Sequence, residues 1–217
     1  VPKTNKITPS ILFNSEPCRN PVRSDKRKRE DSPMTSSFYD LCNDVAFKKV
    51  FNDHENLTLK FLNATLRLEG DRQITSVQFL PQELLPKTAE SKKSILDVKC
   101  TDQRGFQYIV EVQNKPMLPY LQRIQHYVAH TYSGQLKKAK SYLELKPVTM
   151  LSILNHTLFP QDVPYVRFHN NVEAETQRSY FSDMSYAFIE LPKFTKTGSE
   201  ILTVEVYWID TLKSAPH

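Results

Sequence analysis

Apolar positions recur at helical spacing from Phe38 onward and again from Leu57 onward, which predicts two successive amphipathic helices. Asp53 or Asn56 is expected to cap the second helix, because a short polar side chain can bind the free backbone N–H groups there. Gly70 is expected to end that helix. Order is therefore predicted to begin near Phe38 with a helical pair.

Further along the chain the apolar pattern changes to that of strands. Several short segments alternate or are rich in β-branched and aromatic residues, and one is a continuous apolar run typical of a strand buried on both faces. The expected strands are 74–80, 94–101, 107–113, 147–154 and 184–191, with a helix over 118–136. This order of helices and strands predicts a mixed α/β domain.

The hairpin between residues 94 and 113 is the most informative segment. Gly105 suits the left-handed position that closes a three-residue loop, which pairs Asp102 with Phe106. In that register Asp97 lies directly opposite Glu111, whereas a two-residue loop would put the two carboxylates on opposite faces. The three-residue loop is favoured because it also sorts apolar from polar side chains. It places Leu96, Val98, Cys100, Val110 and Val112 on one face, and Asp97, Lys99, Glu111 and Gln113 on the other.

Two opposed carboxylates, Asp97 and Glu111, repel each other unless a cation lies between them. Their hard oxygen atoms suit Mg²⁺ or Mn²⁺. Such an ion could polarise a phosphate and lower the pKa of a water nucleophile, which Lys99 or Gln113 could orient or activate. From spacing alone, the commoner alternative is a solvated polar face on a hairpin that is buried on one side.

Composition excludes several function classes. The chain has four glycines, too few for glycine-rich phosphate loops. Its three cysteines, Cys18, Cys42 and Cys100, are too few and too widely spaced for a disulfide scaffold or a cysteine-rich zinc site. No apolar run reaches the roughly 18 residues of a membrane-spanning helix. We therefore expect a cytoplasmic protein without membrane association.

The net charge of +5 is concentrated at the N-terminus. Residues 1–37 carry eight basic and four acidic residues, which leaves only +1 for residues 38–217. The first segment is predicted to be a disordered basic tail, because it is too polar to offset its chain entropy by burial. Its run Lys26–Arg29 could be a nuclear address in a eukaryotic host or a phosphate-contacting arm, although a solvated charge cluster is the simpler interpretation.

The hairpin also resembles the active-site hairpin of the PD-(D/E)XK nucleases, in the variant where glutamine replaces the motif lysine. Asp97 is followed by thirteen residues and then by Glu111-Val112-Gln113. The surrounding segments, spread over residues 38–212, resemble the recombination-promoting nuclease (Rpn) and transposase family. The matching segments are 43–51, 61–63, 94–98, 110–113, 123–127, 147–148 and 189–194.

This resemblance implies a restriction-endonuclease-like core, a central mixed β-sheet flanked by α-helices, over residues 38–217. It also implies Mg²⁺-dependent hydrolysis of double-stranded DNA, linked to recombination or a mobile element. The oligomeric state stays open, a dimer being one option. Because the chain stops soon after Trp208, where similar proteins continue into more helix, a C-terminally truncated copy is one interpretation.

The family pattern assigns roles to individual residues. Asp97 and Glu111 carry over as metal ligands, and Gln113 takes the place of the motif lysine. An amide can neither supply positive charge nor take a proton, so Lys99 could assume that role and Arg123 could steady a phosphate. The site residues expected are catalytic Asp97, Glu111, Gln113 and Lys99, DNA-binding Arg123, and Asp44 as a further acidic group.

The sequence is also compatible with two other functions. The missing lysine is compatible with a catalytically inactive DNA-binding or protein-interaction module on the same fold. The basic tail is compatible with an adaptor that reaches a partner through residues 1–37. Glu190, which lies in one of the matching segments, is assigned to structure rather than to chemistry.

Overall fold

A computed structural model describes residues 44–84, 94–136 and 141–214, with side chains described from Phe47 onward in the first helix. The tail expected over residues 1–37 lies outside the described residues. Within these ranges no helix has both the length and the apolar character that crossing a membrane requires. The helices are α1 (Asp44–Asp53), α2 (Glu55–Thr65), α3 (Tyr120–Ser133) and α4 (Val204–Ser214).

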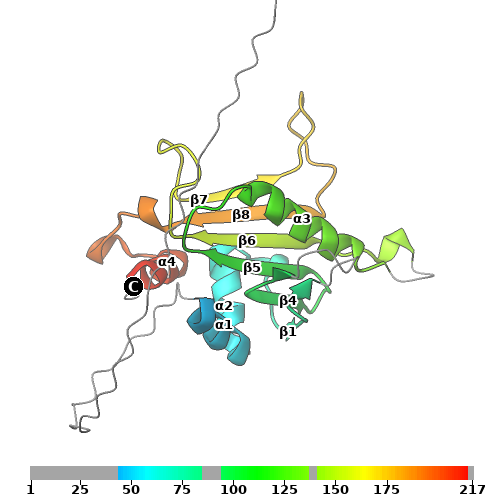
Figure 1. The fold of residues 1–217 in the computed structure, drawn as a ribbon, viewed down its shortest axis with the longest axis horizontal. Helices are drawn as coiled ribbons and strands as arrows, with labels where there is room; N and C mark the ends of the chain where they lie inside the picture. Colours follow the sequence, from blue (N-terminus) through cyan, green and yellow to red (C-terminus); the bar gives the residue numbers. More distant parts are fainter. Residues whose placement is uncertain (1–43, 85–93, 137–140, 215–217) are drawn as a thin grey trace, which may run out of the picture. The chain divides into compact units, whose positions relative to one another are not determined.

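The centre of the fold is a six-stranded mixed sheet (Figure 1). Its order is β1-β4-β5-β6-β8-β7, with β5, β6 and β8 parallel and the other neighbours antiparallel. A short pair, β2 and β3, forms a second sheet. The predicted mixed α/β fold is confirmed. The strands are β1 (Val77–Phe79), β2 (Glu83–Leu84), β3 (Ser94–Ile95), β4 (Val98–Asp102), β5 (Gln107–Gln113), β6 (Val148–Leu154), β7 (Val166–Asn170) and β8 (Met184–Glu190).

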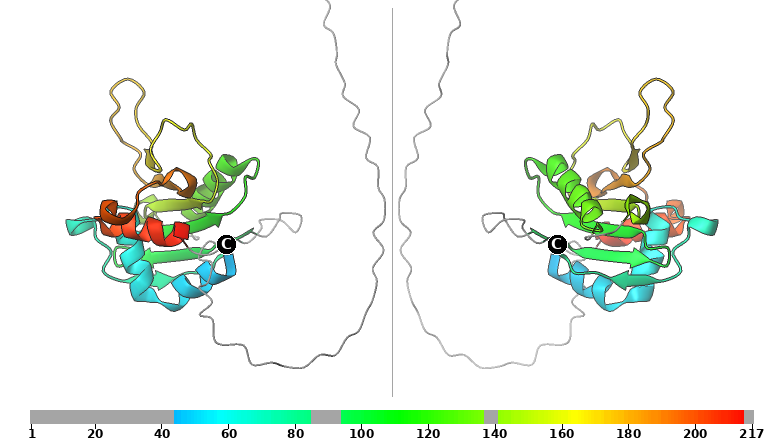
Figure 2. Two further views of the ribbon diagram at one scale, coloured as in Figure 1. Left: turned by 90° about the vertical axis from the view of Figure 1, so that its left-hand side faces the viewer. Right: turned by 90° about the vertical axis from the view of Figure 1, so that its right-hand side faces the viewer.

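Helices cover both faces of the sheet, α3 on one side and α1, α2 and α4 on the other (Figures 1 and 2). The layer of three helices is held together by aromatic rings. Phe51 and Phe61 pack 4.8 Å apart, and Trp208 of α4 meets Phe61 at 5.5 Å between ring centroids. Large aromatic surfaces of this kind contribute much of the apolar burial that stabilises a layer.

The strand β6 lies at the centre of the sheet and is buried on both faces, as its continuous apolar run predicted. Leu151 and Ile153 pack into the core beneath α1, α2 and α4. Val148 and Met150 pack into the core beneath α3. A strand covered by helices on both sides needs apolar residues at odd and even positions alike, so alternation is lost.

Two predicted boundaries of α2 are wrong. Asp53 is the last residue of α1 and Asn56 lies inside α2, so His54 occupies the N-cap position and makes no side-chain capping bond there. Only one residue separates the two helices, which leaves neither polar side chain in the capping position.

The C-terminus of α2 is also earlier than predicted. The helix ends at Thr65, and Arg67 takes the left-handed conformation directly after it, with φ of 53°. Gly70 is also left-handed, with φ of 57°, but it begins the short helix η1 and does not end α2. The backbone N–H of Leu68 donates to the carbonyl of Asn63 at 2.9 Å, which completes a Schellman-type end. Glycine is preferred in this position but is not required there, so the prediction based on Gly70 placed the end of the helix too late.

The elements β2, β7 and α4 did not follow from the sequence pattern. The segment of β7, Val166–Asn170, contains a single buried residue because it forms the edge of the sheet. Helix α4 buries Val206, Ile209 and Leu212 against the other helices. An edge strand with little buried surface gives only a weak periodic signal.

Candidate active site

The hairpin of β4 and β5 has the predicted register. Val98 pairs with Val110, and Cys100 pairs with Tyr108. The loop closes through a hydrogen bond from Gly105 to the carbonyl of Asp102 (2.9 Å), and Gly105 has φ of 83°. This confirms the three-residue loop and the left-handed glycine that were expected.

The regular pairing stops one residue before the predicted acidic pair. Asp97 sits in a bend immediately before β4, and its backbone does not join the ladder. Its side chain turns toward β5 instead, where Oδ2 accepts a hydrogen bond from the backbone N–H of Val112 at 2.6 Å. The Asp97 carboxylate therefore lies against the peptide that follows Glu111, although the two residues are not a regular cross-strand pair.

The same bend corrects the predicted face of Leu96. This residue was expected beside Val98 and Cys100, but it packs with Ile109 and Ile124 beneath α3. Val98 and Cys100 belong to the opposite core. A bend shifts the alternation of side chains by one position, so residues before it change face.

Asp97 and Glu111 are both buried, with 4% and 7% of their surfaces exposed. The alternative of a solvated polar face is therefore wrong, because helix α3 packs over that side of the hairpin. Buried carboxylates require charged or hydrogen-bonding partners, since burial otherwise disfavours the ionised form.

Asp97 is held from two directions. Lys48 of α1 places its Nζ 3.1 Å from Oδ1 of the carboxylate. The backbone carbonyl of Asp97 accepts hydrogen bonds from the side-chain amides of Asn52 (3.1 Å) and Gln82 (2.8 Å). These two amides fix the bend and so aim the carboxylate at β5.

Glu111, Gln113 and Arg123 form the second part of the site. Arg123 of α3 places Nη2 3.3 Å from Oε1 of Glu111 and donates to Oε1 of Gln113 at 2.7 Å. The Nε2 of Gln113 donates to the carbonyl of Lys115 at 2.8 Å. Gln113 thus uses an acceptor for the arginine and a donor for the backbone, a combination that a lysine side chain cannot provide.

The cations that balance the acidic pair come from the protein itself. Lys48 pairs with Asp97 and Arg123 pairs with Glu111, so two acidic groups face two basic groups. Each of these basic side chains is about a quarter exposed and borders solvent.

The two remaining predicted site residues are Lys99 and Asp44. Lys99 pairs in register with Ile109, on the α3 side of β4, and its side chain makes no hydrogen bond or ion pair with the described residues. Burial lowers the pKa of Lys99 from its ordinary value. Asp44 is the first residue of α1, and its side chain lies outside the described part of the protein.

Two buried hydroxyl groups complete the surroundings of Glu111. Ser152 pairs with Glu111 in the parallel ladder and is fully buried, and Tyr120 of α3 is almost as deep. Neither hydroxyl oxygen has a hydrogen-bond partner of normal geometry among the described residues. Burial raises the pKa of Tyr120, the Ser152 hydroxyl opposes this rise, and the charge of Glu111 adds to it. Tyr120 therefore stays a neutral hydroxyl beside the acidic pair.

Sequence reasoning missed Lys48, Asn52 and Gln82. A signal for the first two was present, because they are four residues apart and share one face of a helix beside the buried Phe47 and Phe51. Their contact with Asp97 joins segments 45 or more residues apart along the chain, which spacing within one helix cannot reveal.

A divalent ion needs several ligand atoms, and the side chains of this site can supply some of them. Among the described residues no group of three or more His, Cys, Asp or Glu side chains is arranged to hold a metal. Mg²⁺ is commonly held by only one or two carboxylates, with water and substrate phosphate completing its shell. The two buried carboxylates at Asp97 and Glu111 fit that requirement.

A comparison with known families assigns the chain. Residues 41–217 match the model of the PD-(D/E)XK nuclease family transposases, and the protein belongs to this family. The match covers all the elements described above, including the acidic hairpin. No curated protein and no solved structure gave a match.

Proposed function

We propose that this protein is a Mg²⁺-dependent endonuclease that hydrolyses phosphodiester bonds of double-stranded DNA during recombination or movement of a mobile element. The observation that carries this proposal is the position of the Asp97 carboxylate, which accepts the N–H of Val112 directly after Glu111. Two buried carboxylates at the same end of the hairpin supply the hard oxygen ligands that a divalent ion prefers. Asp97 and Glu111 would hold it, with Mn²⁺ as an alternative ion.

The ion, when bound, supplies positive charge that polarises the phosphate and lowers the pKa of the attacking water. The side chains divide the remaining tasks. Arg123 can turn from Glu111 to a phosphate oxygen, since a guanidinium binds carboxylate and phosphate oxygens through the same donors. Lys48 orients the Asp97 carboxylate through their ion pair until substrate enters.

Gln113 has a defined task in this arrangement. It accepts a hydrogen bond from Arg123 and is fixed in turn by the backbone of Lys115. We assign it the role of positioning Arg123, which then supplies the positive charge that lysine supplies in the usual motif. Lys99 lies on the same side of the hairpin and is the second candidate for that task.

The alternative is an inactive DNA-binding or interaction module on the same fold. One observation favours it: each acidic side chain of the site already has a basic partner within the protein. Such internal pairing lowers the attraction of the site for a cation, although substrate phosphate would compete for the same arginine and lysine.

A plasmid-nicking assay decides between these functions. The wild-type protein is expected to nick supercoiled DNA with Mg²⁺ and to stop when EDTA is added. Asp97→Asn should abolish nicking while circular dichroism and thermal unfolding stay close to wild type, because the amide oxygen can still accept the Val112 N–H. Wild-type protein that does not nick with Mg²⁺ or Mn²⁺, or an Asp97→Asn variant that nicks at the wild-type rate, would contradict the proposal.

A further inference from the structure

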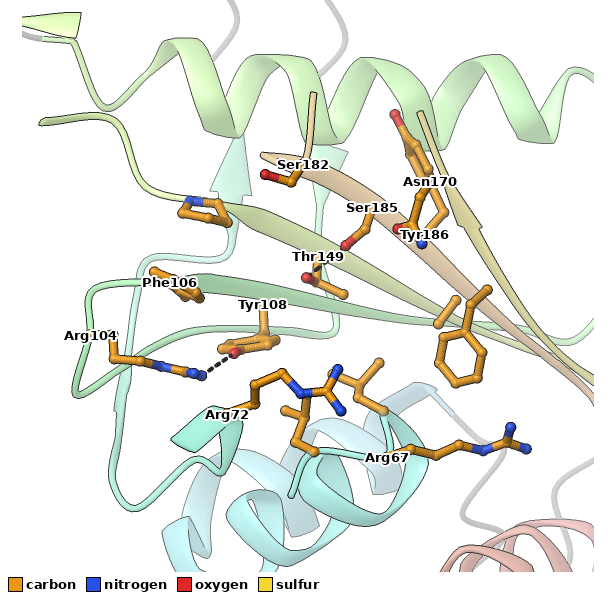
Figure 3. Close-up of a pocket in the computed structure, with 15 residues that line it drawn as sticks. Arg67, Arg72, Arg104, Phe106, Tyr108, Thr149, Asn170, Ser182, Ser185 and Tyr186 are labelled. Atoms are coloured by element: carbon orange, nitrogen blue, oxygen red, sulfur yellow. Dashed lines mark hydrogen bonds between the residues drawn. The ribbon is translucent and has the colours of Figure 1, made fainter. Parts of the chain in front are cut away.

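A pocket lies on the sheet face opposite the candidate active site. It has a volume of about 610 Å³, within the range of pockets that hold small organic ligands. Its floor is formed by the first residues of β5, β6 and β8, and its walls by the end of α2, the hairpin loop and β7 (Figure 3). Tyr108 lines this pocket, and side chains alternate along β5, so Glu111 points to the other side.

The pocket has a positive lining. Arg67, Arg72 and Arg104 are among the residues that line it, and none of the fifteen described lining residues is acidic. Two of these arginines are fixed from behind. Arg104 is paired with the buried Asp102 at 2.5 Å, and Arg67 is paired with Glu205 at 2.9 Å.

Arg72 is different from the other two arginines. It is exposed, it belongs to the short helix η1 (Gly70–Arg72), and its side chain makes no hydrogen bond or ion pair with the described residues. In the view of Figure 3 its guanidinium lies between those of Arg67 and Arg104. A charged group with free donors in a pocket without acidic residues suits an anion, and a guanidinium suits phosphate in particular.

Flat surfaces flank this charge. The guanidinium of Arg104 lies over the ring of Phe106 at 4.5 Å, and that of Arg67 lies over the ring of Phe168 at 5.2 Å. Phe168 is 42% exposed, which is a large apolar surface to leave in contact with water. Stacked arginine and aromatic side chains are the platforms on which proteins hold unpaired nucleic-acid bases.

The floor of the pocket adds polar groups that can bind a sugar or a base edge. The hydroxyls of Thr149 and Ser185 lie 2.9 Å apart on neighbouring strands. The Asn170 side chain lies at the far end of the same floor, where Asn170 pairs in register with Ser185 (Figure 3). Charge, flat surfaces and hydroxyl groups therefore occupy separate parts of one pocket.

We infer that this pocket binds a nucleoside phosphate, with the phosphate on Arg72 and the base against Phe168. The same chemistry occurs in a free mononucleotide and in an unpaired nucleotide at the end of a DNA strand. This binding does not depend on the proposed cleavage, because the pocket and the acidic pair lie on opposite faces of the sheet.

Isothermal titration calorimetry of the full chain in EDTA tests the inference without cleavage. The probes are 2′-deoxyadenosine 5′-monophosphate, deoxyadenosine, inorganic phosphate and a single-stranded pentamer of deoxyadenosine. The monophosphate or the pentamer is expected to bind more tightly than deoxyadenosine or inorganic phosphate. Arg72→Gln should weaken that binding about tenfold, the effect of losing one charge-assisted contact. Phe168→Ala should weaken it by a similar factor.

Control variants separate this site from other causes. Arg178→Gln makes the same chemical change at an exposed arginine outside the pocket lining, and its affinity should equal that of the wild type. Asp97→Asn should also bind normally. Tighter binding of the monophosphate assigns the pocket to free nucleotides, and tighter binding of the pentamer assigns it to a DNA strand. The inference is overturned if no probe binds, or if Arg72→Gln and Phe168→Ala bind like the wild type.

Discussion

Two clusters of buried acids and their basic partners lie near neighbouring strand ends of this protein, one around Glu190 and one around Asp97 and Glu111. They differ in how completely hydrogen bonds and ion pairs satisfy the carboxylates. Glu190, at the end of β8, pairs in register with Leu154, which pairs in turn with Gln113 of the candidate active site. Glu190 is fully buried and accepts the backbone N–H groups of Leu158 (2.6 Å) and Phe159 (3.0 Å).

Two basic side chains complete the cluster around Glu190. Arg167 donates to Oε2, and Lys193 places its Nζ 2.8 Å from the same oxygen. Lys193 also donates to the carbonyl of Pro160 at 2.6 Å and is itself almost fully buried. This cluster attaches the loop after β6 to the end of β8, which agrees with the structural role expected for Glu190.

The pair of Asp97 and Glu111 is held more loosely. Its ion pairs are longer, at 3.1 and 3.3 Å, and its basic partners are each 25% exposed. Lys48 and Arg123 therefore border solvent, whereas Lys193 has only 4% of its side chain exposed. Burial of an acid therefore does not by itself distinguish the candidate active site from the structural cluster. The accessibility of its basic partners separates the two clusters.

The sharpest test makes the same substitution, glutamate to glutamine, in both clusters. The largest expected effect is the loss of DNA-nicking activity in Glu111→Gln. Glu111→Gln removes a charge from the candidate metal site and should lower DNA nicking on the order of 10⁴-fold, since metal charge stabilisation contributes several kcal/mol. Nicking of plasmid DNA with Mg²⁺ measures this. A variant that retains a tenth of wild-type activity would contradict a ligand role for Glu111.

The matched change, Glu190→Gln, should affect stability instead. It leaves the charges of Arg167 and Lys193 buried without their acid, which typically costs about 3–5 kcal/mol. Urea unfolding followed by circular dichroism measures this loss. Glu111→Gln is the control and should lose less, because Arg123 borders water. Equal stability losses in both variants would remove the distinction between the clusters.

A third change examines the position of the motif lysine. Gln113→Lys restores the motif lysine. It also removes the oxygen that accepts the hydrogen bond from Arg123 and adds a second positive charge beside the guanidinium. Nicking should therefore fall, by roughly tenfold to a hundredfold, as expected when a preorganised charge is displaced. Gln113→Ala is the control that removes the acceptor without adding charge. Higher activity in Gln113→Lys would show that the lysine, and not Arg123, supplies the missing charge.

The smallest expected effect is the dependence of stability on pH. Burial alone would raise the pKa of Glu190, but the Lys193 hydrogen bond and the two backbone N–H groups outweigh it and hold the pKa below its ordinary value of 4.5. The stabilising contribution of Glu190 is therefore complete above pH 4.5 and is lost as the pH falls toward the lowered pKa.

The measurement is the difference in unfolding free energy between the wild type and Glu190→Gln. This difference should stay constant from neutral pH down to about 5 and then decrease, by about 1.4 kcal/mol for each unit of pKa depression. A difference that grows with acidity would mean that the pKa of Glu190 is raised in the folded protein.

Local chemistry accounts for what could be predicted from the sequence. The glycine at position 105 set the hairpin loop, and the loop set the register that brings Asp97 and Glu111 to the same end of β4 and β5. The unbroken apolar run of β6 identified a central strand. Both are short-range signals, because a turn residue or a periodicity acts within a few neighbours.

Tertiary structure alone decided how the site is completed. The bend at Asp97 depends on Asn52 and Gln82, which approach from other elements and moved Leu96 to the face beneath α3. The basic partners Lys48 and Arg123 come from two helices on opposite sides of the sheet. The sequence by itself determined which two acidic residues lie at the same end of the hairpin. Only the packing of α1 and α3 decided which basic groups face them, because contacts between distant segments leave no periodic trace in the chain.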